Sequence, residues 1–275
     1  MKNITYITLF FISFFFVGCE KVIDVGLETA APKLVIDASI KWVKGTAGNE
    51  QTIKLSTTSD YYSNVVPSVA GAQVFITNTD TNLIFDFIEN PGTGNYVCTT
   101  FVPVLNANYT LTVIYDEQIY IADEKLIPVP TIDKIEQKTN QGFNSPYYEI
   151  KAFYTDNGAT DDFYLFRYKT NFDIFPSYEA SEDEFYQGNQ FFGLYINEDI
   201  KAGDNLDINI YGISQRYYDY MLKIISIAGG AGGSPFQTPP ATVRGNIINT
   251  TNEVQYPLGY FNASEVDFRN YVVQE

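Results

Sequence analysis

Most of the chain alternates hydrophobic and polar residues with a period of two, which is the pattern of half-buried β-strands. Such segments recur roughly every 8–12 residues between turn residues, a spacing typical of β-sandwiches. In the first half we expect strands at 33–42, 52–56, 72–77, 83–88, 95–100, 109–115 and 118–123. The pattern predicts an all-β protein with one or two β-sandwich lobes of immunoglobulin-like size.

The second half continues the strand pattern and adds one segment with helical periodicity. Further strands are expected at 147–154, 162–168, 191–196 and 206–211, and a last one begins at Leu258. Hydrophobic residues recur at three- and four-residue steps at Tyr217, Tyr220, Met221, Ile224, Ile225 and Ala228. With Ser214 as N-cap and Gly229-Gly230 as the stop, this stripe predicts a helix at Gln215–Ala228. We interpret the stripe as core packing rather than as a binding face.

A pair of prolines marks the best candidate for a domain boundary. Pro128-Val129-Pro130 disfavours a continuing central strand, because proline lacks the amide hydrogen that a strand donates. We therefore predict an N-terminal β-sandwich domain at residues 33–127 and a C-terminal β-rich domain with one helix at residues 128–275. The alternative is one continuous, elongated sandwich.

The N-terminus has the pattern of an exported lipoprotein. A basic start precedes a hydrophobic run that ends at Gly18-Cys19 and is shorter than the roughly 20 residues of a transmembrane helix. Residues 1–18 are predicted to be a signal peptide and residues 19–32 a lipidated tether. Phe16-Val17-Gly18-Cys19 resembles a lipobox, so Cys19 is the expected site of acylation. Because Glu20 follows, rather than an aspartate, we expect an outer-membrane location. We also expect the protein to face the cell exterior.

The chain is strongly acidic, with 33 Asp and Glu residues against 17 Lys and Arg residues and a formal net charge of −16. Removal of residues 1–18 takes away Lys2 and leaves −17. This balance disfavours nucleic acid, whose phosphates bind Lys and Arg, and disfavours lying flat on an anionic membrane. We expect no nucleic-acid partner and interpret the charge mainly as a source of solubility at the cell surface.

The absence of histidine excludes several kinds of catalysis. Without it, Ser-His-Asp catalysis, Cys-His catalysis and His-ligated zinc are ruled out. Paired carboxylates could still hydrolyse glycosides, but Asp and Glu are too abundant here to discriminate. We therefore expect no enzyme activity, no catalytic residue and no cofactor. Besides Cys19 the chain has only Cys98, so we expect no intramolecular disulfide in the mature chain and interpret Cys98 as a buried, inert thiol.

Two acidic segments are candidates for a cation-binding or ligand-binding loop. The first contains Glu179, Glu182, Asp183 and Glu184. The second, residues 156–162, contains Asp156 and Asp161. Hard cations such as Ca²⁺ bind several oxygen ligands in a flexible loop. Neither segment has the spacing of an EF-hand, so a solvated acidic loop is the alternative at both places, and we predict no defined metal site.

Several short motifs together resemble those of a bacterial family. They lie at residues 19–24, 34–40, 69–74, 130–133, 181–188, 217–225 and 258–264. On these motifs the chain resembles the Bacteroidetes outer-membrane lipoprotein family of unknown function DUF4249 over nearly its whole length.

The resemblance implies an accessory role in nutrient capture, since members of the family are often encoded near TonB-dependent outer-membrane transporters. It implies no catalytic residue. The leading hypothesis is a surface binding module that works with such a transporter. The alternative is a structural or adhesive cell-surface lipoprotein with no small-molecule ligand.

Overall fold

The computed structural model describes residues 31–60, 63, 65–141, 146–228 and 243–275. The described part within Pro32–Glu275 belongs to one compact unit. The predicted signal peptide at residues 1–18, Cys19 and nearly all of the tether lie outside the described residues. Within the described part of the chain, no helix is both long and apolar enough to cross a membrane.

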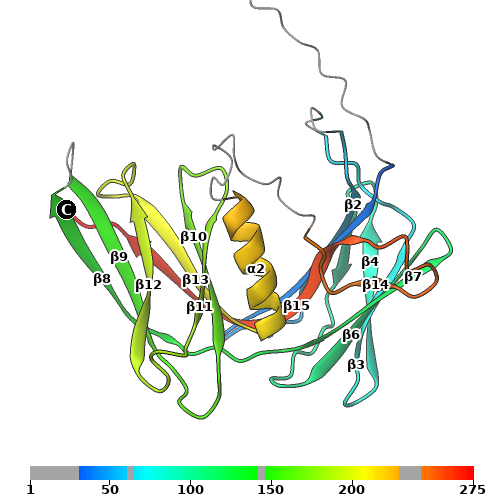
Figure 1. Ribbon diagram of the computed structural model, residues 1–275, viewed down its shortest axis with the longest axis horizontal. Coiled ribbons are helices and arrows are strands. Elements are labelled where there is room, and N and C mark those ends of the chain that lie inside the picture. Colours follow the sequence, from blue (N-terminus) through cyan, green and yellow to red (C-terminus); the bar gives the residue numbers. More distant parts are fainter. Residues whose placement is uncertain (1–30, 61–62, 64, 142–145, 229–242) are drawn as a thin grey trace, which may run out of the picture. The chain divides into compact units, whose positions relative to one another are not determined.

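The described residues are mostly β-structure, which confirms the predicted fold class (Figure 1). The N-terminal half contains β1 (Leu34–Val43), β2 (Gln51–Thr57), β3 (Gln73–Asn78), β4 (Leu83–Asn90), β5 (Asn95–Cys98), β6 (Asn108–Tyr115) and β7 (Gln118–Lys125). The C-terminal half contains β8 (Ile132–Gln141), β9 (Pro146–Thr155), β10 (Phe163–Thr170), β11 (Ser177–Glu182), β12 (Gln190–Asn197), β13 (Asn205–Ile213), α2 (Gln215–Ala228), β14 (Ile248–Asn249) and β15 (Leu258–Val272). The predicted helix is confirmed with the same bounds.

The strands form one sheet of twelve strands and a second sheet of three. The order in the large sheet is β11-β10-β13-β15-β1-β2-β5-β4-β3-β6-β7-β14, and the small sheet has the order β12-β9-β8. The last strand, β15, belongs to both halves of the large sheet. From Leu258 to Val266 it pairs in parallel with β1, and from Val266 to Val272 it pairs antiparallel with β13.

Two large hydrophobic cores lie on either side of this shared strand in the sheet order. The first contains residues of β15, β1, β2 and β5 together with residues of β3, β4, β6 and β7, such as Ile36, Ile76 and Phe261. The second lies between the small sheet and strands β10 and β13, where the ring of Tyr154 meets those of Tyr164 and Phe166 at centroid distances of 4.9 and 5.7 Å. Each fully buried aromatic side chain removes about 150–250 Å² from water, so these rings supply much of the driving force for folding.

The helix α2 begins where the sequence predicts, because Ser214 caps it. The Ser214 hydroxyl accepts a hydrogen bond from the amide of Tyr217 at 3.3 Å and donates one to Glu124 on β7 at 3.1 Å. The helix packs on β10 and β11 (Figure 1). A third, smaller core of Leu165, Tyr211, Ile213, Tyr218, Met221 and Val266 joins the helix to the sheet.

The segment that contains Pro128-Val129-Pro130 is held on β15 by two buried carboxylates. Glu265 accepts a hydrogen bond from the amide of Val129 at 2.9 Å and forms an ion pair with Lys44 at 3.0 Å. Asp267 accepts one from the amide of Ile132 at 2.7 Å. A Cβ on Gly212 of β13 would collide with the carbonyl of Pro128, so glycine is required for the segment to cross there. The two-domain division at this segment stays a prediction.

Three strands are absent from the sequence-based prediction: β8, β11 and β14. In β8 the alternation is weak, with polar residues at most positions and a register irregularity between Ile132 and Lys134. The edge strand β11 has the acidic sequence SYEASE, which the prediction assigned partly to an acidic loop. The strands β8 and β11 form because they pair with a neighbouring strand, and such pairing is not encoded in their own hydrophobic pattern.

The carboxylate contacts predict that Glu265→Ala loosens the segment around Val129, while Asp267 still holds Ile132. Hydrogen bonds to charged groups contribute about 1.5–3 kcal/mol, so cleavage by a protease within this segment should become at least about tenfold faster. Limited proteolysis with mass mapping of the fragments measures this. Glu136→Ala is the matched control, because Glu136 pairs with Lys134 on an exposed surface. Equal cleavage of Glu265→Ala and the wild type in this segment would contradict the interpretation.

Candidate functional site

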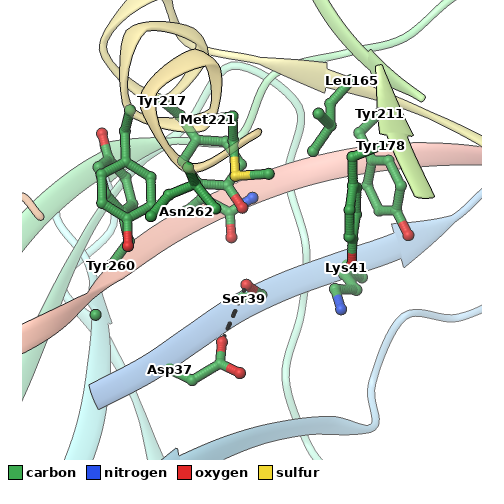
Figure 2. Close-up of a pocket in the computed structure, with 13 residues that line it drawn as sticks. Asp37, Ser39, Lys41, Leu165, Tyr178, Tyr211, Tyr217, Met221, Tyr260 and Asn262 are labelled. Atoms are coloured by element: carbon green, nitrogen blue, oxygen red, sulfur yellow. Dashed lines mark hydrogen bonds between the residues drawn. The ribbon is translucent and has the colours of Figure 1, made fainter. Parts of the chain in front are cut away.

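A cavity of about 390 Å³ lies between α2 and the face of the large sheet formed by β1, β15, β13, β10 and β11 (Figure 2). Its helix side is formed by Tyr217, Tyr220, Met221 and Ile224. The sheet side contributes Asp37, Ser39, Lys41, Leu165, Tyr178, Tyr211, Gly259, Tyr260 and Asn262. Cavities of this size with mainly aromatic walls and a few polar groups are typical of small-molecule sites.

The polar residues of the cavity are placed by strand periodicity. In β1, Ile36, Ala38 and Ile40 point into the first core, so the alternate residues Asp37, Ser39 and Lys41 line the opposite face. The parallel register sets Asp37 beside Tyr260 and Ser39 beside Asn262 on β15. The result is a stripe with a carboxylate at one end, a hydroxyl in the middle and an ammonium group at the other end.

Asn262 carries an unsatisfied hydrogen-bond acceptor. Its side chain is only 4% exposed, and its amide nitrogen donates to the Ser264 hydroxyl at 3.3 Å, but its Oδ1 has no partner. A buried polar atom without a partner costs about 1–3 kcal/mol, so such atoms in folded proteins call for an explanation. The Tyr260 hydroxyl also lacks a partner. Arg216 and Ser214 lie close enough to this hydroxyl to act on its pKa. Asn262 Oδ1 is therefore the clearer example of a buried polar atom without a partner.

Four tyrosines of the cavity, Tyr211, Tyr217, Tyr220 and Tyr260, have raised pKa values. Burial raises the pKa of Tyr211 to about 12, and it also raises the pKa values of Tyr217, Tyr220 and Tyr260. Their hydroxyls therefore remain hydrogen-bond donors, while their rings provide flat apolar surface. The ring of Tyr260 lies 4.7 Å from those of both Tyr217 and Tyr220, so strand and helix meet through these rings.

Lys41 is a cation without an ion-pair partner among the described residues. Desolvation lowers the pKa of Lys41, Asp37 partly offsets this effect, and the nearby Arg167 lowers the pKa further. Arg167 lies two residues from Leu165 on β10, on the same face of the strand, and likewise has no ion pair within the described part of the chain. In so acidic a protein, two neighbouring unpaired cations favour an anionic group of a ligand at this end of the cavity.

The helix stripe therefore has two roles, of which the sequence analysis predicted one. Met221 belongs to the third core, and Tyr217, Tyr220 and Ile225 pack against it, as predicted for core residues. Tyr217, Tyr220, Met221 and Ile224 also line the cavity. Ala228 is exposed. The alternation of hydrophobic and polar residues in β1 predicts that one face of the strand is polar. Nothing in the local sequence indicates that this face lies beside Asn262.

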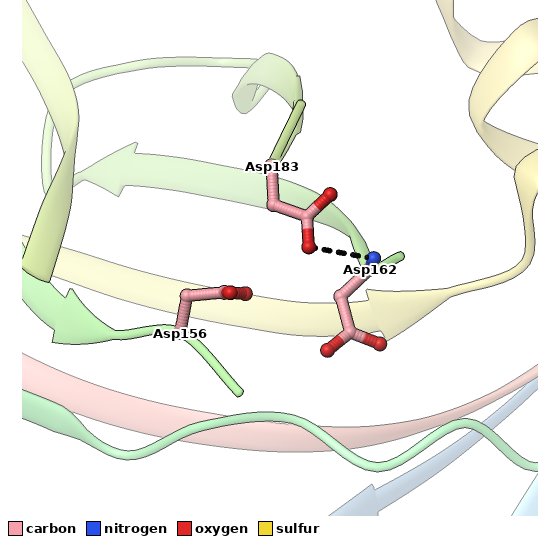
Figure 3. A group of neighbouring side chains, drawn as sticks. All are labelled: Asp156, Asp162 and Asp183. Atoms are coloured by element: carbon pink, nitrogen blue, oxygen red, sulfur yellow. Dashed lines mark hydrogen bonds between the residues drawn. The ribbon is translucent and has the colours of Figure 1, made fainter. Parts of the chain in front are cut away.

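The two acidic segments come together around three aspartates (Figure 3). Asp156, Asp162 and Asp183 each offer a carboxylate oxygen, and these oxygens lie within 4.8 Å of one another. Asp156 and Asp183 are among the predicted residues, whereas Asp162 was only part of the predicted segment. The other predicted residues lie elsewhere. Asp161 is exposed and accepts a hydrogen bond from Gln187 at 3.1 Å, Glu184 is exposed, and Glu182 lies near Tyr218 of α2.

The three aspartates already have structural partners. Asp156 accepts hydrogen bonds from the Tyr164 hydroxyl at 2.5 Å and the amide of Gly188 at 2.7 Å, while Asp183 accepts one from the amide of Asp162 at 2.9 Å. These bonds join the loop after β9 to the loop after β11. The cluster could supply three oxygens to a hard cation, which usually takes six to eight ligands in the case of Ca²⁺. Cation binding here stays a prediction.

Two other features lie outside this site and have protein contacts of their own. A second cavity, of about 420 Å³, is lined by Arg244 and Tyr256, but Arg244 and Lys33 already lie 3.6 and 3.7 Å from the centroid of the Tyr256 ring. Cys98 is a free thiol and is buried, as predicted. Its sulfur lies 3.7 Å from the Thr100 hydroxyl.

The fold and the cavity define a mostly β protein with a ligand-sized space beneath its helix. The family described as "Domain of unknown function (DUF4249)" matches residues 20–269, so the chain belongs to this family. A comparison with curated proteins finds no match.

Solved structures with similar segments share little sequence with this chain. One contains the FN1–FN3 domains of chicken CNTN1, with 14% identity, a TM-score of 0.27 and coverage of 66% of this chain and 60% of that one. Another is a two-domain fibronectin type III segment of chicken tenascin, with 11% identity, a TM-score of 0.21 and coverage of 66% and 90%. A third is a DUF4785 family protein from Legionella pneumophila, with 10% identity, a TM-score of 0.26 and coverage of 66% and 51%.

The aspartate cluster predicts a pH-dependent effect of Asp162→Asn. Burial is the main cause that raises the pKa values of Asp162 and Asp183 in the folded state, and the charge of Asp156 adds to it. The folded state therefore binds protons more readily than the unfolded state, and its stability falls as the pH rises through these pKa values. Asp162→Asn should increase the free energy of unfolding by up to about 1 kcal/mol at neutral pH, and this gain should shrink towards about pH 4.

Urea unfolding of the wild type and the variant at a series of pH values measures this difference. Asp86→Asn is the control, because Asp86 is exposed on β4 and its charge does not act on Asp162 or Asp183. A gain that did not depend on pH, or a loss of stability at neutral pH, would contradict the account. Added Ca²⁺ tests cation binding in the same experiment, since a bound cation should raise the midpoint of the wild type more than that of Asp162→Asn.

Proposed function

We propose that this protein is a lipid-anchored outer-membrane binding protein. It captures a small ligand in the cavity beneath α2 and works with a TonB-dependent transporter. The observation that carries the binding role is the unpartnered Oδ1 of Asn262, which is buried and lines a cavity walled by tyrosines. A ligand with a hydrogen-bond donor would satisfy this atom and so recover part of the free energy that its burial costs.

The anchoring role is supported by the sequence. The run that ends at Gly18-Cys19 has the features of a lipoprotein signal, and acyl chains on Cys19 would hold the mature chain at a membrane. The resemblance to Bacteroidetes lipoproteins supports two further parts of the proposal. These are that the protein faces the cell exterior and that its partner is a transporter. A tethered capture protein raises the local concentration of its ligand near the transporter, which needs no catalysis.

Binding without turnover fits the chemistry of the cavity. Asp37 and Lys41 are the acidic and basic residues that line it, and the lining as described holds no second carboxylate to act with Asp37. The alternative, a structural or adhesive lipoprotein with no small ligand, gives no reason for a buried acceptor to remain free.

Lipid anchoring predicts that Cys19→Ala moves the protein from the membrane fraction to the periplasm or the medium. The acyl thioether requires the sulfur of Cys19, whereas Pro32–Glu275 form a compact unit of their own. Labelled palmitate should enter the wild type and not the variant, and the circular dichroism spectra of the two should agree. Label in the variant, or a soluble and unlabelled wild type, would overturn the lipoprotein assignment.

Ligand capture predicts that filling the cavity abolishes retention of small molecules. The lipoprotein, purified in detergent, is incubated with the small-molecule fraction of growth medium, washed and analysed by native mass spectrometry. The wild type should retain compounds that Ser39→Trp does not, because Ser39 lines the cavity. Thr112→Trp is the control, since Thr112 is a partly exposed strand residue of β6 outside the cavity. Equal retention by all three proteins, or retention by none, would contradict capture at this site.

Capture for a transporter is tested separately in intact cells. After cross-linking, tagged wild-type protein should bring down an outer-membrane transporter of the TonB-dependent class, and Cys19→Ala should bring down less. Repeated absence of any transporter would contradict this part of the proposal and leave ligand capture standing.

A further inference from the structure

The stripe along β1 has the dimensions of a short extended peptide. Asp37 and Lys41 are four residues apart on one strand, which corresponds to roughly 13 Å between their backbone positions. An extended peptide of three or four residues spans a similar length, at about 3.3–3.6 Å per residue. Its terminal ammonium and carboxylate groups would then meet the carboxylate of Asp37 and the ammonium of Lys41.

The free acceptor lies at the middle of this stripe. Ser39 is midway between the two charged residues, and the parallel register places Asn262 beside Ser39. A peptide bond offers an N–H donor at this position, whereas the two ends of the stripe would take the two termini. One ligand could thus satisfy all three groups in a single extended conformation.

The charges at the two ends are available. Asp37 is exposed, and its carboxylate accepts a long hydrogen bond of 3.4 Å from the Ser39 hydroxyl. Lys41 has no ion pair among the described residues, and Arg167 adds positive charge at the same end. A neutral ligand would form no ion pair with Asp37 or Lys41.

The walls suit the side chains of a peptide. Tyr178, Tyr211, Tyr217 and Tyr220 present aromatic rings, and Met221 adds a flexible thioether. Aromatic and methionine side chains pack against hydrophobic groups of varied shape, which permits a range of sequences.

From these observations we infer that the cavity binds short peptides with free termini, with the amino end at Asp37, a backbone amide at Asn262 and the carboxyl end at Lys41. The inference rests on the proposed capture function and names its ligand class.

Isothermal titration of the detergent-purified lipoprotein with the tetrapeptide Ala-Phe-Ala-Ala tests this. Amidation of the carboxyl terminus should weaken binding about tenfold, which is typical for loss of one charged hydrogen bond. Lys41→Gln should weaken binding of the free acid by a similar factor and leave binding of the amidated peptide unchanged. Acetylation of the amino terminus should likewise weaken binding about tenfold. Asp37→Asn should weaken binding of the peptide with a free amino terminus by a similar factor and leave binding of the acetylated peptide unchanged.

Two exposed residues outside the cavity provide matched controls. Lys138→Gln on β8 and Asp86→Asn on β4 remove the same charges as Lys41→Gln and Asp37→Asn, and both should leave binding of all peptides unchanged. If the control variants weakened binding as much as the cavity variants, the charge contacts would be overturned.

Asn262→Leu separates a ligand contact from a structural role. Asn262→Leu removes the free acceptor and also the hydrogen bond to the buried Ser264 hydroxyl, so the midpoint of unfolding without ligand should fall by no more than the loss of that one bond, while peptide binding weakens at least tenfold. A lower midpoint with unchanged peptide affinity would show that Asn262 serves the fold and would overturn its place in the inference.

A neutral saccharide distinguishes failure of this inference from failure of the proposed function. If maltotetraose bound and Ser39→Trp abolished its binding, while the peptide did not bind, the peptide inference would be wrong and capture would stand. If peptide binding did not respond to amidation or to Lys41→Gln, the orientation inferred here would be wrong. If neither probe bound and the retention experiment was also negative, the proposed function would fail with it.

Discussion

The structure depends on the double pairing of β15. This one strand is a parallel neighbour of β1 near the start of the described chain and an antiparallel neighbour of β13 near its end. It therefore joins the strands that cover the first core to those that cover the second. Parallel pairing between distant segments closes a long loop before it gains contacts, so we expect this step to be slow in folding.

The same strand carries an unusual set of buried polar residues. Asn262, Ser264, Glu265 and Asp267 are all at most 6% exposed. Glu265 and Asp267 have partners, because they bind the amides of the segment that connects the two halves of the chain. Asn262 keeps one atom free. The hydroxyl of Tyr260, on the same strand, also lacks a partner, and both residues line the cavity. This supports the proposal that a ligand completes their hydrogen bonds.

The sequence predicts the parts of this structure that arise from local patterns. Alternation in β1 and the Ser214 cap of α2 were sufficient to place both elements. The strands β8 and β11 were missed, since their pairing depends on neighbours and not on their own hydrophobic pattern. The sequence predicts Asp156 and Asp183 as candidate ligands in two separate segments. Only the fold shows that their carboxylates lie close to each other and to that of Asp162. The cavity needed the register between Ser39 and Asn262, which no local pattern encodes.

The central claim is that the space between α2 and strands β1 and β15 is a ligand site. The most direct test is a crystal structure of the lipoprotein isolated from its own outer membrane, with whatever ligand it retains. The account predicts continuous density in the cavity, with a hydrogen-bond donor of the ligand within about 3.2 Å of Asn262 Oδ1. A cavity closed by movement of α2, with Asn262 Oδ1 bonded to a protein group instead, would contradict it.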